Sequence, residues 1–240
     1  MTTPEILTEL ESLGTEQNRK IYGRHGVTGD MFGVSYAHLD KLAKSLRKSA
    51  SAELVCDLWA SGNHDARILA SKLFQADWLS VKCVDGWVAD VKSGVLSGAL
   101  ANAIGKSGWP GAVKTADRWL KAKPAKRPWV AFSGWYLVSA LAAFDETAPD
   151  DWFEPLLNRV RDELPSASNE MKQAMNDALI AIGCRTPALR EKAEAVARKI
   201  GKVEVDHGET SCKTPQAIPY LEKVWAHKAA KASKTAPSRP

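Results

Sequence analysis

Residues 36–46, YAHLDKLAKSL, carry the pattern that decides the fold. Their apolar side chains recur three and four positions apart, which places on one face of a helix Tyr36, Leu39, Leu42, Ala43 and Leu46. The opposite face of the same segment carries Lys41, Lys44 and Arg47. This spacing predicts an amphipathic α-helix that buries one side and leaves the other in water.

The same spacing continues along nearly the whole chain, so we predict about a dozen helices joined by short connections. Alternation with a period of two, which would indicate a strand, is confined to the few residues of KVEVD at 202–206. Residues typical of helix starts stand at Ser51, at Ser168 or Asn169, and in the pairs Thr186-Pro187 and Thr214-Pro215.

Adjacent predicted helices pair into units of about 35–45 residues, the spacing of HEAT or armadillo-type repeats. Such units bury their apolar faces by stacking, which predicts an all-α HEAT-like solenoid with a concave face. A compact helical bundle is the alternative. We expect a single helical domain over residues 1–228. A basic, disordered tail is expected over 229–240, which is rich in Lys, Ala, Ser and Pro.

The bulk composition narrows the class of protein. Of the 240 residues, 45% are hydrophobic and 25% are charged, a composition that excludes a disordered chain. The sequence contains no run of 18 apolar residues, so no membrane span is predicted. The N-terminus lacks the pattern of a secretory signal, so a cytoplasmic protein with four reduced cysteines is expected. A net charge of +5 favours a polyanionic partner, and no motif calls for a cofactor.

Two segments carry a family resemblance: MFGVSYAHLDKLAKSLRK at 31–48 and LWASGNHDARILASKLF at 58–74. They resemble the opening helices of the DNA alkylation repair family, the AlkD-like HEAT-repeat DNA glycosylases. A weaker likeness continues through KRPWVAFSGWYLVSAL at 126–141 to about residue 185. The resemblance implies a basic concave surface that binds double-stranded DNA. It also implies hydrolysis of the N-glycosidic bond of alkylpurines, with a carboxylate stabilising the oxocarbenium-like sugar.

The positions at which the family carries its catalytic Trp, Asp and Arg hold other residues here. The helix implied to carry a Trp and an Asp falls on GVLSGALAN at 94–102, and a later Trp falls near Asp177. Ala131 and Phe132 follow Trp129-Val130 where the family has an arginine. If the protein is an enzyme, the candidates for the catalytic carboxylate are Asp177, Asp206 and Glu209.

Basic and aromatic side chains give candidates for contacts with nucleic acid. The densest cluster of positive charge lies in a proline-broken stretch with Lys121, Lys123, Lys126 and Arg127. The other candidates are Asn102, Lys106 and Lys213 for phosphate, and Trp109 and Trp129 for stacking. These residues are also compatible with a solvated loop and plain packing, and a non-catalytic protein-interaction scaffold is the alternative function.

One polar stretch, VEVDHGETSCKTP at 203–215, has two interpretations. His207 and Cys212 are weak candidates for metal ligands or for a nucleophilic pair, and a hydrolase or metal enzyme centred here is a third function. The spacing lacks any CxxC or HxxxH pair, so we predict no metal site. The favoured interpretation is a closing loop in which these side chains satisfy backbone groups before a terminal helix.

Overall fold

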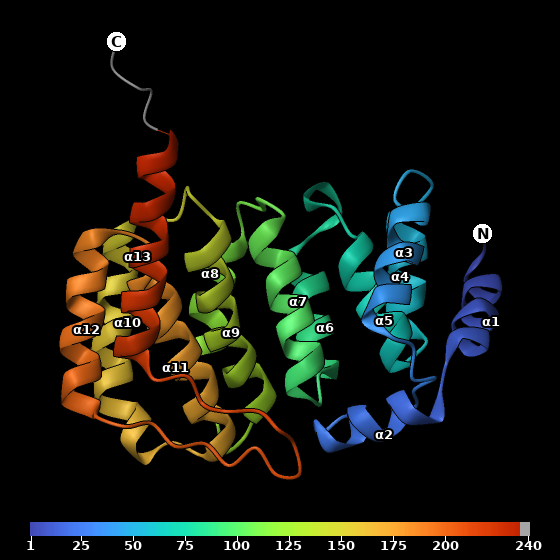
Figure 1. Ribbon diagram of the computed structural model, residues 1–240. Helices are drawn as coiled ribbons and strands as arrows, with labels where there is room; N and C mark the ends of the chain where they lie inside the picture. Colours follow the sequence, from blue (N-terminus) through green and yellow to red (C-terminus); the bar gives the residue numbers. More distant parts are fainter. Residues whose placement is uncertain (236–240) are drawn as a thin grey trace. The chain divides into compact units, whose positions relative to one another are not determined.

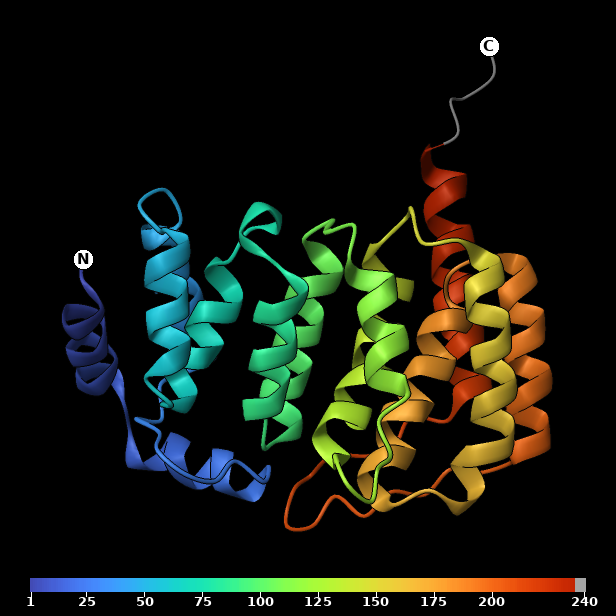
Figure 2. The same ribbon diagram turned by 180° about the vertical axis from the view of Figure 1, so that it is seen from behind.

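The computed structural model describes residues 1–235, with side chains to residue 231 (Figures 1 and 2). Within this part the chain forms thirteen α-helices and no strand, which confirms the all-α prediction. The first seven are α1 (Thr3–Leu13), α2 (Glu16–Arg24), α3 (Tyr36–Leu46), α4 (Ala52–Ala60), α5 (His64–Leu73), α6 (Val81–Asp90) and α7 (Gly94–Lys106). The others are α8 (Ala112–Leu120), α9 (Pro128–Phe144), α10 (Asp150–Glu163), α11 (Asn169–Gly183), α12 (Pro187–Ile200) and α13 (Ala217–Thr235). Short 3-10 helices lie at Ala76–Trp78 (η1) and Leu164–Ser166 (η2).

Backbone contacts divide the chain into two compact units, and each is described by itself. The first unit contains Met1–Leu137 with Gly208–Thr210, and the second contains Val138–His207 with the residues from Ser211 onward. The single domain expected over 1–228 stays a prediction. Its predicted boundary with the tail falls inside α13, which continues to Thr235, and the remaining tail residues, 236–240, lie outside the described part of the chain.

Most of the predicted helix starts are confirmed. Helix α3 spans the predicted residues, and Ser51 caps α4 by accepting a hydrogen bond from the Leu54 amide at 3.2 Å. Thr186 caps α12, with Pro187 at its first position. These starts were predictable because each rests on residues adjacent in sequence.

The predicted start at Thr214-Pro215 was wrong, because α13 begins at Ala217. Tertiary contacts use both residues instead. The Thr214 hydroxyl lies 3.0 Å from His207 Nε2, and the Pro215 carbonyl accepts a hydrogen bond from Asn176 at 2.9 Å. Residues 202–206, the one candidate for alternation, lie in an irregular loop.

In the first unit, α5 packs against α3, α4 and α7 and forms the centre. The shared core is made of aliphatic side chains from these helices, among them Leu39, Leu58, Leu69, Leu100 and Ile104. Between α4 and α6 the rings of Trp59 and Trp87 stack with centroids 4.8 Å apart.

A buried carboxylate fixes the segment that leads into α3. Asp65, fully buried in the first turn of α5, accepts hydrogen bonds from three consecutive backbone amides, at 2.7 Å from Phe32, 3.0 Å from Gly33 and 2.9 Å from Val34. Gly33 has a φ of 80°, a backbone conformation that glycine adopts readily. One side chain of α5 therefore holds the backbone that leads into α3, a helix that lines the groove of the first unit.

The neighbouring His64 predicts a pH dependence of the first unit. Its ring is buried against Tyr22, its Nε2 has no hydrogen-bond partner, and burial lowers its pKa. The folded state therefore binds fewer protons than the unfolded state below about pH 6.5. We expect stability to fall as the pH drops from there toward the lowered pKa. In His64→Phe this part of the loss should vanish, as measured by urea unfolding between about pH 5 and 7.

In the second unit, α11 and α12 pack together, α10 lies against both, and α13 packs against α11 and α12. Its core is built from Phe153, Val160, Leu179, Ile182 and Leu221, all nearly inaccessible to solvent. This unit thus combines consecutive helices with one helix that returns from the long loop.

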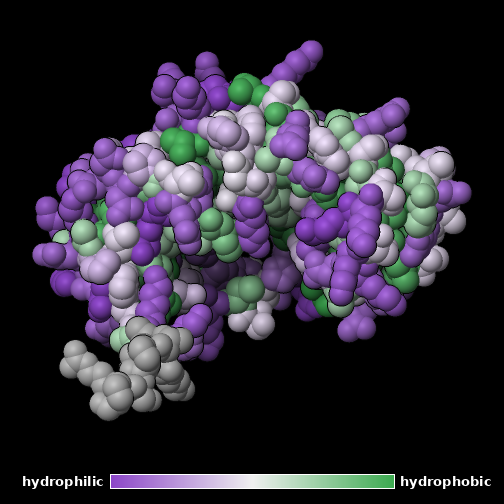
Figure 3. Space-filling view, turned by 90° about the horizontal axis from the view of Figure 1, so that it is seen from above, coloured by the Kyte–Doolittle hydropathy of each residue, from purple (hydrophilic) through white to green (hydrophobic). Residues whose placement is uncertain are grey.

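The surface of the described chain is mainly polar on the face shown in Figure 3, where hydrophobic side chains form only scattered small areas. None of the described helices is both long enough and apolar enough to cross a lipid bilayer. The cytoplasmic location stays a prediction.

Candidate nucleic-acid interface

A groove of about 1290 Å³ lies within the first unit. The alternate helices α3, α5 and α7 line it, together with the turn that follows α5. The face of α7 toward the groove contains Gly94, Gly98, Asn102 and Lys106, each four residues from the next. The groove is therefore lined by glycine where α7 begins and by polar side chains where α7 ends.

The two glycines lie against aromatic rings of α9, where an added Cβ atom would be at the short end of ordinary contact. A Cβ atom at Gly94 would lie 3.3 Å from the Phe132 ring, and one at Gly98 would lie 3.4 Å from the Tyr136 ring. These two rings have centroids 4.8 Å apart. Helix α7 is the one that the resemblance implies should carry the family's Trp and Asp. In this chain it offers small residues to the groove, and the aromatic rings of α9 pack against these small residues.

The groove carries an excess of positive charge. Its basic lining residues are Lys44, Arg47, Lys72 and Lys106, and its acidic ones are Asp40 and Asp77. Lys72 is paired with Asp40 at 2.6 Å, and its ammonium lies 5.2 Å from the centre of the Tyr36 ring. Three of the four cations, Lys44, Lys72 and Lys106, come from three different helices. Cations of this kind can contact the phosphates of a nucleic-acid backbone.

Two of the predicted contact residues, Asn102 and Lys106, line this groove. The others do not. The predicted basic cluster lies in the exposed loop between α8 and α9. Trp109 lies in the turn before α8, while Trp129 lies in the first turn of α9 with its ring 5.4 Å from that of Phe132. Lys213 is exposed in the loop of the second unit. Their roles in binding stay predictions.

Sequence reasoning missed three of the basic groove residues, Lys44, Arg47 and Lys72. Lys44 and Arg47 were assigned to the polar face of the helix at 36–46, which a single sequence presents as an ordinary solvated face. The sequence offered one signal for the third residue: Lys72 lies near the end of an amphipathic helix two helices after the one at 36–46. Only the packing of α3, α5 and α7 brings the three together.

The three candidate acids lie elsewhere. Asp206 is exposed, and its backbone exchanges two hydrogen bonds with the Asn169 amide, at 2.6 and 2.8 Å. Glu209 is exposed in the segment 208–210. Asp177 lies on α11, where the Gln173 side chain donates to both of its oxygens at 2.8 Å. None of the three is among the residues that line the groove of the first unit.

Loop 201–216 has a structural role in the second unit. The Gln216 side chain bonds both the amide and the carbonyl of Val203, at 3.3 and 2.9 Å, and His207 bonds Thr214. Among the described residues no group of three His, Cys, Asp or Glu side chains is placed to hold a metal ion. Cys212 is exposed and forms no disulfide. These contacts favour the closing-loop interpretation.

The sequence profile described as DNA alkylation repair enzyme matches residues 6–221. The chain belongs to this family. Two similar relatives are "Uncharacterized protein Lin0241" of Listeria innocua, 28% identical, and "Uncharacterized protein Lmo0209" of Listeria monocytogenes, 27% identical. Each alignment covers 93% of this chain and 97% of the relative.

The fold of this family member is also similar to a solved structure described as "A new family of proteins related to the HEAT-like repeat DNA glycosylases with affinity for branched DNA structures". The TM-score is 0.81, the sequence identity is 26%, and 95% of each chain is covered. Both the family resemblance and the HEAT-like fold predicted from the sequence are therefore confirmed.

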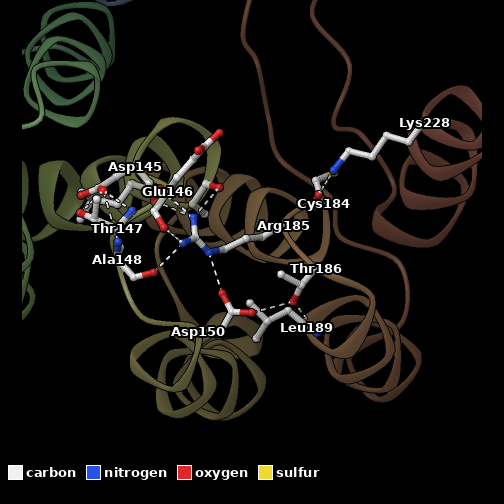
Figure 4. Close-up of polar contacts among 12 residues, drawn as sticks. Asp145, Glu146, Thr147, Ala148, Asp150, Cys184, Arg185, Thr186, Leu189 and Lys228 are labelled. Carbon is white, nitrogen blue, oxygen red and sulfur yellow. Dashed lines mark hydrogen bonds and ion pairs between the residues drawn. The ribbon is translucent and has the colours of Figure 1, made fainter. Parts of the chain in front are cut away.

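A second cavity of this DNA alkylation repair family member, about 800 Å³ in volume, lies within the second unit. Beside it Arg185 joins three elements (Figure 4). Its guanidinium, on a side chain that is 11% exposed, pairs with Asp150 at 2.8 Å and donates to the carbonyl oxygens of Asp145 at 2.7 Å and of Ala148. The end of α9 and the start of α10 are thereby fixed against the end of α11.

Replacing Arg185 by lysine is expected to lower the free energy of unfolding by about 1–2 kcal/mol, because one ammonium cannot replace the planar fork of donors. The hydrogen bonds from Arg185 and Thr186 lower the pKa of Asp150. Ionised Asp150 therefore stabilises the fold above about pH 4, and this contribution is lost as the pH falls below that value. Acid unfolding of Arg185→Lys, followed by circular dichroism, should begin at a higher pH. An unchanged profile would contradict this assignment.

Proposed function

We propose that this protein binds DNA through the groove of the first unit and prefers branched or distorted duplexes to linear ones. The proposal rests on the set of cations on α3, α5 and α7 along a groove that α7 lines with Gly94 and Gly98. Membership of the DNA alkylation repair family and the affinity for branched DNA described for the structural relative support it.

The chemistry of the groove suits a phosphate backbone more than a protein partner. Lysine and arginine release counterions from DNA when they meet phosphates, which gives affinity without reading sequence. The side-chain amide of Asn102 adds neutral donors for phosphate oxygens. On the side of α7 the groove offers glycine, alanine and valine, and its large apolar lining residues are Tyr36, Leu73 and Phe74.

A branched DNA has more than one duplex arm, and the first unit offers a second basic surface for another arm. The loop between α8 and α9 exposes its four cations, Lys121, Lys123, Lys126 and Arg127. The start of α9 follows directly, and the positive end of a helix dipole also favours anions. Contacts at both surfaces would favour a junction over a linear duplex.

Binding, rather than base excision, is the activity that this groove supports. Hydrolysis of an N-glycosidic bond needs a carboxylate beside the sugar. The candidates Asp177, Asp206 and Glu209 do not line the groove. Its own carboxylates are Asp40, which is paired with Lys72, and Asp77, which is exposed in the 3-10 turn after α5.

Fluorescence anisotropy with a labelled three-way junction and a linear duplex of the same arm sequence tests the proposal. We expect the junction to bind about tenfold more tightly, and both affinities to fall as salt is raised. Equal affinities would contradict the preference for branched DNA. Absence of binding to either DNA at low salt would contradict the proposed function and would favour a protein-binding scaffold.

A further inference from the structure

The cavity of the second unit has three walls. They are the end of α9 with Phe144, the face of α11 with Asp177 and Ile180, and the face of α13 with Tyr220 and Lys228. Its volume of about 800 Å³ lies in the range of sites that bind small molecules. The cavity is therefore large enough for one planar ring system with an attached polar group.

Polar contacts fix all three walls before any ligand binds. On α11 the amide of Gln173 holds both oxygens of Asp177. The indole of Trp225 on α13 donates to the carbonyl of Gly183 at 2.9 Å, which ties α13 to the end of α11. Arg185 holds the end of α9 (Figure 4). A cavity with fixed walls loses little conformational entropy when it is filled.

The side chains that face this cavity suit an aromatic ligand. Phe144 and Tyr220 are both 46% exposed, although large hydrophobic side chains are normally covered, and both line the cavity. Two exposed rings in a hollow indicate a site for a flat partner. The carboxylate of Asp177 supplies an acceptor, and the ammonium of Lys228, directed toward the Cys184 carbonyl, supplies a positive charge.

We propose that this cavity binds an unpaired nucleobase. Its ring would lie against Phe144 and Tyr220, its exocyclic amino group toward Asp177, and its phosphate toward Lys228. Guanine fits best, since its N1–H and amino group offer two donors to one carboxylate, whereas thymine has no amino group. The inference rests on the proposed function in one respect: branch points are where a DNA ligand would supply such a base.

The test compares three-way junctions that carry, at the branch, either one unpaired guanine or an abasic analogue. Stacking on an aromatic side chain predicts that the full-length protein binds the guanine junction about tenfold more tightly. Phe144→Ser and Tyr220→Ser should each remove most of this preference. Val81→Ser is the matched control and should keep the preference, because Val81 is also 46% exposed but lies on α6 and lines neither cavity.

The outcomes separate this inference from the proposed function. Equal binding of both junctions by the wild-type protein would overturn the nucleobase site and leave DNA binding by the groove intact. Loss of the preference in Val81→Ser as well would also overturn the site. If no DNA binds, the cavity can be tested by calorimetric titration with guanosine monophosphate. Binding that Tyr220→Ser abolishes would support the cavity as a site for free nucleotides. Absence of saturable binding would overturn the nucleobase site.

Discussion

Replacing Asp65 by alanine is expected to lower the free energy of unfolding by about 3–6 kcal/mol, because two buried backbone amides and one part-buried amide would lose their common acceptor. This is a large share of the roughly 5–15 kcal/mol by which domains are usually stable. The amides of Phe32, Gly33 and Val34 lie in the segment that leads into α3, so this wall of the groove should loosen as well. Thermal unfolding followed by circular dichroism measures the effect.

Two further variants make the result specific. Asp65→Asn keeps the shape and one acceptor oxygen, so its loss of stability should be intermediate. Asp57→Ala removes an exposed carboxylate from α4 and should change stability by less than about 0.5 kcal/mol. Equal stability of Asp65→Ala and Asp57→Ala would show that the buried carboxylate does not organise the first unit.

The combined replacement Lys44→Gln, Arg47→Gln and Lys106→Gln is expected to weaken DNA binding on the order of 100-fold near 0.1 M salt, since each lost phosphate contact contributes separately. Lys72 is kept, because its pairing with Asp40 stabilises the groove. The thermal stability of the variant should change little, as Lys44, Arg47 and Lys106 are exposed. Fluorescence anisotropy with the three-way junction measures the affinity.

A matched variant controls for the change in net charge. Lys20→Gln, Lys82→Gln and Lys92→Gln remove the same charge from exposed positions of the first unit outside the groove. If binding depends on the groove, this control should lose only a small part of the affinity. An equal loss in both variants would indicate that overall charge, rather than the groove, attracts the DNA.

Local patterns in the sequence predicted most of the fold. The stripe of Leu39, Leu42 and Leu46 and the caps at Ser51 and Thr186 depend on neighbours within four residues, so a single sequence reveals them. The start of α13 was predicted wrongly because Thr214 and Pro215 are held by His207 and Asn176, which local reasoning cannot see.

The candidate site was less predictable for the same physical reason. Asn102 and Lys106 were predicted because they lie on the same face near the end of one helix. Arg47 and Lys72 belong to separate parts of the sequence, and only the packing of the helices brings them to one groove. Likewise, Asp65 reads as an ordinary acidic residue near a helix start, and its amide partners lie 31–33 positions away in the sequence. Asp177 was noted for its position, but Gln173, which holds it, was missed.

The slope of log affinity against log salt concentration tests the central claim most directly. It should be measured with the three-way junction for the wild-type protein, for the groove variant at Lys44, Arg47 and Lys106, and for the control at Lys20, Lys82 and Lys92. Each phosphate contact contributes about 0.9 to the slope, so three lost contacts should make the groove variant's slope shallower by roughly 2–3, with the control unchanged. Parallel lines for the wild-type protein and the groove variant would contradict DNA binding by this groove.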